Sequence, residues 1–172
     1  AQPSHLIDLR NVPGLRGIRH DGGELIIGAM TTHWDIQSSA LVKSTVPVLA
    51  EMAGMIADPL VRNRGTIGGS TVHGDPAADY PAALLALEAE MVCQSRRGRR
   101  VVAANEWFTS LMRTSITDDE ILVELRVPVP PSRTGASYAK HPHPATRFAV
   151  AGAAVLRLGP AHRLPLPLRG MR

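Results

Sequence analysis

The residue types best suited to binding a charged ligand are concentrated in residues 62–79, RNRGTIGGSTVHGDPAAD. Residues 65–71 contain three glycines and three hydroxyl side chains, and the carboxylates of Asp75 and Asp79 follow. Glycine lets a backbone approach a ligand closely, and a turn that points several N–H groups into one concavity can hold a phosphate. A carboxylate just beyond can bind a ribose hydroxyl, as in other dinucleotide sites. The spacing therefore predicts a short polar turn at a nucleotide phosphate site.

The same stretch also has a purely structural interpretation, because a Gly-Gly pair is most often only a turn. It lacks the Gly-Lys-Ser/Thr of a P-loop and the Gly-x-Gly-x-x-Gly of a Rossmann fingerprint. His73 and Asp75 suggest metal or acid–base chemistry, but no third ligand lies at a suitable spacing. The sequence therefore does not predict a metal site here.

Short strands and helices are expected to position these residues. Strands are predicted at residues 5–9, 17–20, 24–30, 91–94, 100–102, 121–127, 136–140 and 148–158. Hairpin turns are predicted at residues 21–23 and 96–99. Ser44 or Thr45 is expected to cap a helix that has Pro47 in its first turn. A further helix is predicted over residues 80–88, directly after Asp79. This mixture, without a regular βαβ series, predicts an α+β fold with small mixed sheets and flanking helices.

The distribution of charged and apolar residues excludes some classes of protein. Residues 1–124 carry 11 basic and 15 acidic side chains, whereas residues 125–172 carry eight basic and no acidic ones. The high overall pI is therefore a property of one end, and no basic run is interleaved with aromatic residues. We accordingly expect no nucleic-acid binding, and no apolar run is long enough to predict a membrane span.

The longer string RNRGTIGGSTVHGDPAADYPAALLAL, at residues 62–87, resembles the flavin-binding subunit of the molybdenum hydroxylases. This family includes the medium subunit of aerobic carbon monoxide dehydrogenase and the central domain of xanthine dehydrogenase. Further segments resemble it in the same order, among them GGELIIGAMTTHWDI and SYAKHPHPATRFAVAGAAV. The resemblance covers roughly residues 2–156 and implies the FAD-binding fold of the molybdopterin dehydrogenases.

The resemblance implies a set of site residues in the glycine-rich stretch. The residues that match the loop holding the FAD pyrophosphate are Thr66, Ile67, Gly68, Gly69 and Ser70. The residue types agree with this role, because backbone donors and a hydroxyl would face the phosphates with no side chain in the way at the two adjacent glycines.

Four further residues match family positions near the cofactor. Asp79 matches an aspartate that contacts the ribose of the adenosine half, and its alternative role is a plain helix cap. Leu122 matches an apolar residue of the flavin pocket, and its alternative role is that of a core leucine on a strand. Lys140 matches a lysine close to the flavin, where a positive charge would stabilise the reduced, anionic cofactor. Its alternative role is that of an ordinary surface lysine. Ile56 occupies a position near the cofactor in relatives.

The resemblance also implies an activity. The full protein is expected to be an oxidoreductase subunit that binds FAD and passes electrons from a molybdenum centre, through iron–sulfur clusters, to an external acceptor. The one cysteine, Cys93, leaves too few thiolates for a cluster. The Mo-pterin cofactor and the 2Fe-2S clusters are therefore expected on partner subunits, a molybdopterin-binding large subunit and an iron–sulfur small subunit. The absence of a signal pattern favours a cytoplasmic protein.

The resemblance further predicts a domain organisation. Residues 1–131 are expected to form the FAD-binding domain, 132–158 the start of the C-terminal flavoprotein domain, and 159–172 a disordered tail. Relatives carry an earlier glycine loop, which would lie before Ala1, so the chain is expected to be truncated at its N-terminus. The alternative function is a flavin-free remnant that keeps only structural or subunit contacts.

Overall fold

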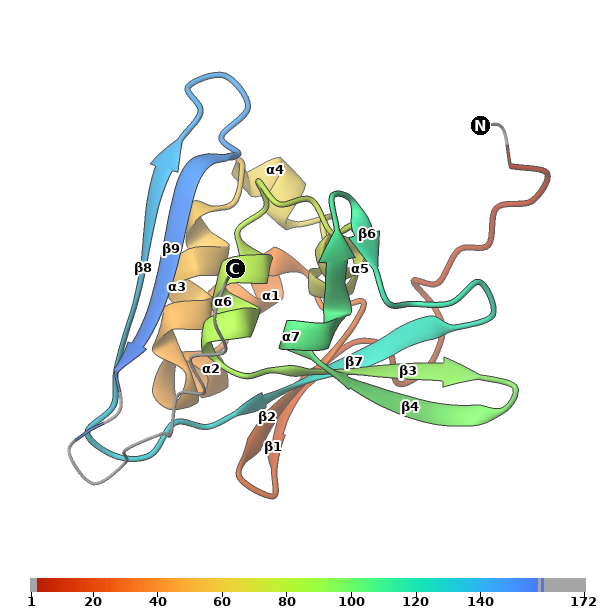
Figure 1. The fold of residues 1–172 in the computed structure, drawn as a ribbon, viewed down its shortest axis with the longest axis horizontal. Helices are drawn as coiled ribbons and strands as arrows, with labels where there is room; N and C mark the ends of the chain where they lie inside the picture. Colours follow the sequence, from red (N-terminus) through yellow and green to blue (C-terminus); the bar gives the residue numbers. More distant parts are fainter. Residues whose placement is uncertain (1–2, 158, 160–172) are drawn as a thin grey trace, which may run out of the picture.

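A five-stranded antiparallel sheet forms the base of the molecule in the computed structural model, which describes residues 3–157 and 159 (Figure 1). Its strand order is β1-β2-β7-β3-β4. The strands are β1 (Ile18–Asp21), β2 (Glu24–Gly28), β3 (Glu90–Ser95), β4 (Gly98–Ala103) and β7 (Ile121–Pro128). The two hairpins β1–β2 and β3–β4 flank β7, which pairs with both. The predicted α+β class is confirmed.

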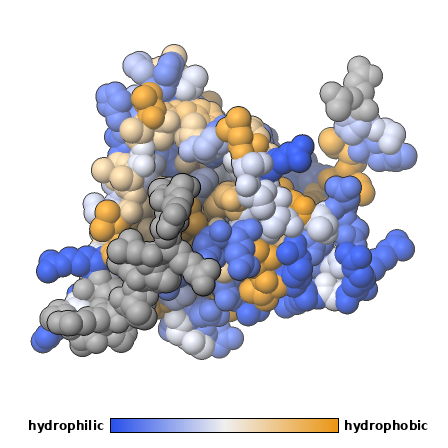
Figure 2. All heavy atoms as spheres, in the orientation of Figure 1, coloured by the Kyte–Doolittle hydropathy of each residue, from blue (hydrophilic) through white to orange (hydrophobic). Residues whose placement is uncertain are grey.

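Turn residues account for the two sheet hairpins. Gly22 and Gly23 adopt φ of 58° and 84° between β1 and β2, a conformation that glycine reaches without a steric penalty. Gly98 adopts φ of 123° at the start of β4. The hairpins expected from these glycines are therefore present, and the arginine-rich tip of β3–β4 is hydrophilic (Figure 2).

Short helices cover one face of the sheet (Figure 1). They are α1 (His33–Ser38), α2 (Ala40–Thr45), α3 (Pro47–Met55), α4 (Pro59–Arg62), α5 (Ile67–His73), α6 (Tyr80–Ala86) and α7 (Ala104–Trp107). The core lies between the helices and the sheet, where alternate strand residues such as Leu25 and Ile27 are completely buried. Trp107 is buried with them, and its indole Nε1 donates to the Thr71 carbonyl at 2.9 Å.

Local side chains decide where the first helices begin. Thr32 and Asp35 form a reciprocal capping box at the start of α1, and Ser39 caps α2. The expectation that Ser44 or Thr45 caps α3 is wrong: both hydroxyls donate to the Leu41 carbonyl within α2. The N-cap of α3 is instead a valine, without a side-chain cap.

Two small two-stranded sheets complete the described chain, and the strand predicted at residues 5–9 is not formed. They pair β5 (Phe108–Ser110) with β6 (Arg113–Thr114), and β8 (Gly135–Pro142) with β9 (Ala149–Arg157). The β8–β9 hairpin packs against α3 and α6, and its outer surface is largely apolar (Figure 2). The predicted domain boundary after residue 131 falls between β7 and β8, and the division itself stays a prediction. Apart from Gly159, the predicted tail lies outside the described residues.

Among the residues that the structure describes, no helix has the length and apolar character needed to cross a membrane.

Candidate functional site

The glycine-rich stretch forms the first turn of helix α5. Thr66 is the N-cap, with φ of −119° and ψ of 153°, and its Oγ1 accepts a hydrogen bond from the Gly69 N–H at 3.1 Å. The helix then continues to His73 and ends at Gly74 in the left-handed conformation. The prediction of a short polar turn was therefore wrong in its backbone conformation, because the threonine hydroxyl replaces the missing carbonyl and lets the helix start at once.

The three glycines of this stretch have negative φ and differ in what surrounds them. A Cβ on Gly65 would lie 2.6 Å from His33 Nε2, and one on Gly68 would lie 2.5 Å from the Ala29 Cβ. A Cβ on Gly69 would approach only Thr66 Oγ1, at 3.0 Å. Gly68 therefore allows α5 to pack closely against the chain that follows β2. Gly69 instead leaves the space beside it open.

Most of the N–H groups expected to bind phosphate are used within the protein. The N–H of Ile67 donates to the Thr31 carbonyl at 3.0 Å, and that of Gly68 donates to the Ala29 carbonyl at 2.9 Å. The N–H of Gly69 donates to the N-cap hydroxyl. The Thr66 N–H has no hydrogen-bond partner among residues 3–157 and 159. The donors left for a ligand are therefore this N–H and the hydroxyls of Thr66 and Ser70.

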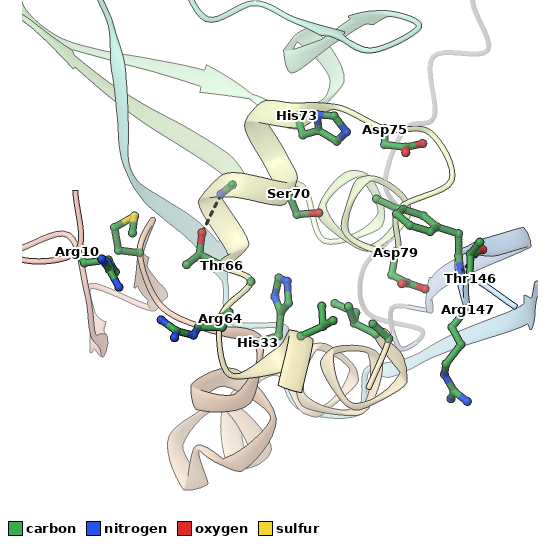
Figure 3. A pocket seen from close by; sticks show the side chains of 18 of the residues that line it. Arg10, His33, Arg64, Thr66, Ser70, His73, Asp75, Asp79, Thr146 and Arg147 are labelled. Carbon is green, nitrogen blue, oxygen red and sulfur yellow. Dashed lines mark hydrogen bonds between the residues drawn. The ribbon is translucent and has the colours of Figure 1, made fainter. Parts of the chain in front are cut away.

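A cavity of about 660 Å³ opens beside this end of α5 (Figure 3), within the size range of small-molecule and cofactor sites, roughly 300–1,000 Å³. The predicted site residues that line it are Thr66, Gly69, Ser70, Asp79 and Ile56. Its walls come from α4, α5, the loop before α6 and the tip of the β8–β9 hairpin.

Four other predicted site residues do not line the cavity. Ile67 is completely buried in the core, and Gly68 is buried against Ala29. Leu122 is buried in β7, as its alternative role of core leucine predicts. Lys140 reaches the site only through Asp79.

Three arginines that the sequence analysis missed line the cavity: Arg10, Arg64 and Arg147. Arg10 is paired with Asp8 at 2.7 Å, so these two charges compensate each other. Arg64 and Arg147 form no ion pair with any residue in the described part of the chain. The proximity of Arg64 to Thr66 in sequence was an available signal, whereas Arg10 and Arg147 arrive from distant segments.

Asp79 is a buried carboxylate of the cavity with two side-chain partners. Its Oδ1 accepts from the Tyr138 hydroxyl at 2.6 Å, and its Oδ2 accepts from Lys140 Nζ at 2.9 Å. Asp79 occupies the N-cap position of α6 but makes no side-chain cap hydrogen bond, so the capping alternative is wrong. The surface-lysine alternative is also wrong, because the Lys140 side chain is 4% exposed. The Tyr138 phenol has a raised pKa, chiefly because it is buried, and also because its ionisation would place a second anion beside Asp79.

His33 is buried at the edge of the cavity, and its Nδ1 lies 3.2 Å from the Tyr80 hydroxyl. Burial lowers the pKa of His33 to about 4, since the charged imidazolium would lose its hydration. The imidazole is therefore neutral at physiological pH and can offer the cavity a hydrogen-bonding nitrogen without a charge.

No cluster of three or more potential metal-ligating side chains occurs within the described ranges. His73 and Asp75 do line the cavity together (Figure 3). Asp75 Oδ1 accepts from the Ala77 N–H at 2.8 Å, which orders the loop before α6.

Comparison with known proteins gives consistent matches. Residues 1–130 match the family described as the FAD binding domain in molybdopterin dehydrogenase. The chain is 47% identical over 156 residues to the carbon monoxide dehydrogenase medium chain of Hydrogenophaga pseudoflava, covering 91% of this chain and 54% of that one. It is 40% identical over 154 residues to the 6-hydroxypseudooxynicotine dehydrogenase complex subunit alpha of Paenarthrobacter nicotinovorans, covering 90% of this chain and 52% of that one.

The structural comparison points in the same direction. A solved structure of carbon monoxide dehydrogenase from Hydrogenophaga pseudoflava superposes with a TM-score of 0.88 at 47% identity, over 91% of this chain and 54% of that chain. The chain thus spans about half the length of the curated relatives it matches.

Proposed function

Because the chain belongs to the family of FAD-binding domains of molybdopterin dehydrogenases, we propose that its cavity binds FAD. We further propose that it acts in the FAD-carrying medium subunit of a molybdenum-containing oxidoreductase. The observation that carries this proposal is the cavity beside the N-terminus of α5, where Thr66, Gly69 and Ser70 face a space of about 660 Å³.

The polar side of the cavity suits a diphosphate. The free Thr66 N–H and the hydroxyls of Thr66 and Ser70 are hydrogen-bond donors, and Gly69 leaves room for close approach. Arg64 and Arg147 supply positive charge, which is well suited to phosphate oxygens because the guanidinium presents several donors in one plane.

The remaining walls suit flat, largely apolar rings. Ile56, Val61 and Phe148 line the cavity, and Arg62 holds the chain at Ile56 by donating to its carbonyl at 2.8 Å. When bound, FAD supplies the redox chemistry by accepting and releasing electrons, and the protein supplies binding, orientation and electrostatics. The chain's own residues therefore need only hold the cofactor and exclude water.

The partners follow from the same family. We propose that electrons reach FAD from a Mo-pterin centre on a large subunit through 2Fe-2S clusters on a small subunit, and leave to an external acceptor. The names of the relatives support a molybdenum enzyme but point to different substrates, carbon monoxide and 6-hydroxypseudooxynicotine among them. The substrate of this protein's complex is therefore left open, and its proposed location is the cytoplasm.

The test is direct titration of the purified 172-residue chain with FAD, followed by flavin fluorescence quenching. We expect saturable binding that Ser70→Ala weakens, because that variant removes a cavity hydroxyl. Ser44→Ala is the matched control, since its hydroxyl bonds only within α2. No saturable binding by the unmodified chain would contradict the proposal and favour the flavin-free alternative.

A further inference from the structure

Two side chains of strand β8 converge on Asp79 from the same face. Tyr138 and Lys140 are two residues apart, so both point towards α6. They bind different oxygens of the carboxylate, at 2.6 Å and 2.9 Å. Lys140 Nζ also lies 3.3 Å from the Met55 carbonyl, at the end of α3 next to the cavity wall. The hairpin is therefore bonded to both helices that it covers.

All three side chains are almost completely inaccessible: Tyr138 is 6% exposed, and the side chains of Asp79 and Lys140 are 5% and 4% exposed. Asp79 nevertheless lines the cavity. A carboxylate oxygen can accept more than one hydrogen bond, so each oxygen retains acceptor capacity after its protein partner is bound. The carboxylate is thus held at two points with a free lone pair on each oxygen.

Strand β9 leaves room for this arrangement. Gly152 lies opposite Lys140 in the β8–β9 ladder, and a Cβ on it would lie 2.8 Å from the Tyr138 hydroxyl oxygen. Its backbone does not require glycine, since its φ is not positive. The glycine is therefore explained by the space that the tyrosine hydroxyl occupies.

The charge of this group matters because the proposed ligand carries a diphosphate. An uncompensated carboxylate in the cavity would repel it, and a carboxylate buried without a partner is costly. Lys140, which does not line the cavity, compensates the charge of Asp79. The Asp79 carboxylate therefore presents a fixed hydrogen-bond acceptor to the cavity. Such an acceptor suits a hydroxyl donor of a ligand and does not suit a phosphate oxygen.

We propose that Tyr138 is a positioning residue for FAD: together with Lys140 it orients the Asp79 carboxylate to accept a hydrogen bond from a hydroxyl of the cofactor. The inference rests on the proposed FAD site. Lys140 accordingly acts on the site through Asp79, as its counter-ion.

The experiment compares FAD dissociation constants of the full chain and its variants. Tyr138→Phe removes only the hydroxyl and should weaken FAD binding about tenfold, in line with the loss of one hydrogen bond to a charged group. Ser137→Ala, on the exposed side of the same strand, should bind FAD as the unmodified chain does. Thermal unfolding and far-UV circular dichroism of each variant report whether the fold is retained.

The same substitution in a second variant distinguishes a positioning role of Tyr138 from a role in packing. In Asp79→Ala/Lys140→Met, which removes the buried ion pair as a unit, Tyr138→Phe should cause no further loss of FAD affinity. A residue that acts only on packing would cost the same in both backgrounds, because independent effects add. Should Tyr138→Phe fail to fold, Gly152→Ala provides the same comparison, since its methyl group displaces the hydroxyl.

The outcomes separate this inference from the proposed function. If the unmodified chain binds FAD and Tyr138→Phe binds it equally well, or weakens it by the same factor in both backgrounds, the positioning role is overturned and the FAD site stands. If the unmodified chain shows no saturable FAD binding, both are overturned.

Discussion

The imidazole of His33 lies directly against the Cα of Gly65, so that a Cβ at residue 65 would lie 2.6 Å from Nε2. The two residues belong to neighbouring segments joined by the His33 N–H, which donates to the Gly65 carbonyl at 3.0 Å. The only residue that leaves this space free is glycine. The contact places a buried neutral imidazole at the edge of the cavity.

Gly65→Ala should therefore destabilise the protein. The added methyl group must displace His33, which also contacts the Tyr80 hydroxyl, and overpacking of this kind costs about 1–3 kcal/mol. Urea unfolding monitored by circular dichroism measures the loss. Gly135→Ala is the matched control, because a Cβ there meets nothing within 4 Å and φ is not positive. Equal stabilities of the two variants would contradict the packing argument.

His33 should make stability depend on pH between its two pKa values. Its pKa is about 4 in the folded protein and about 6.5 when unfolded. As the pH falls from 6.5 to 4, His33 becomes protonated in the unfolded chain but stays neutral in the folded chain. Protonation therefore favours the unfolded state, and the free energy of unfolding decreases. The shift corresponds to a loss of about 3 kcal/mol at most.

Measurement of this pH effect requires a difference between variants, because carboxylates titrate in the same range. The stability of the unmodified protein relative to His33→Gln should fall as the pH is lowered from 6.5 to 4, and should stay constant above pH 7. His20→Gln replaces an exposed histidine of β1 and should not remove the dependence. A pH-independent difference for His33→Gln would show that folding does not shift the pKa of this imidazole, which would contradict the argument from burial.

Two adjacent glycines should give opposite results. Gly69→Val should leave the protein folded but reduce FAD affinity by more than about tenfold, a loss of 1.4 kcal/mol or more, because the side chain projects into the proposed phosphate space. Gly68→Ala should instead unfold or strongly destabilise the chain, since its Cβ would lie 2.6 Å from the Ala29 carbonyl oxygen. Flavin fluorescence titration and thermal unfolding distinguish the two. Normal FAD affinity of Gly69→Val would refute the assigned position of the phosphates.

Thr66 should contribute to both stability and binding. Thr66→Val removes the cap hydrogen bond to Gly69 and should cost about 1 kcal/mol of stability, together with a loss of FAD affinity. Ser39→Ala removes the cap of α2, whose hydroxyl bonds the Val42 N–H away from the cavity. It should lower stability comparably and leave FAD affinity unchanged. A loss of affinity in Ser39→Ala would mean that binding simply follows stability.

Local chemistry was sufficient to predict several features from the sequence alone. The Gly22-Gly23 hairpin follows from turn residues that reach positive φ at little cost. The hydroxyl-rich stretch and Asp79 were placed together correctly, because only a few residues separate them and both lie at helix starts. The backbone form of that stretch was not predicted, because two adjacent glycines are typical of a turn, whereas Thr66 caps a helix at this point.

Tertiary structure alone decided which of the candidate residues face the cavity. Leu122 is buried in β7 and does not line the cavity. Its strand lies between β2 and β3, an order that depends on pairing between segments distant in the sequence. Lys140 meets Asp79 although 61 positions separate them, and Arg147 reaches the cavity from the hairpin tip. The sequence by itself determined which groups can bind a nucleotide diphosphate, because that depends on residue type and short spacing. Which of them do so together depends on packing between distant segments, where burial and charge compensation select one arrangement.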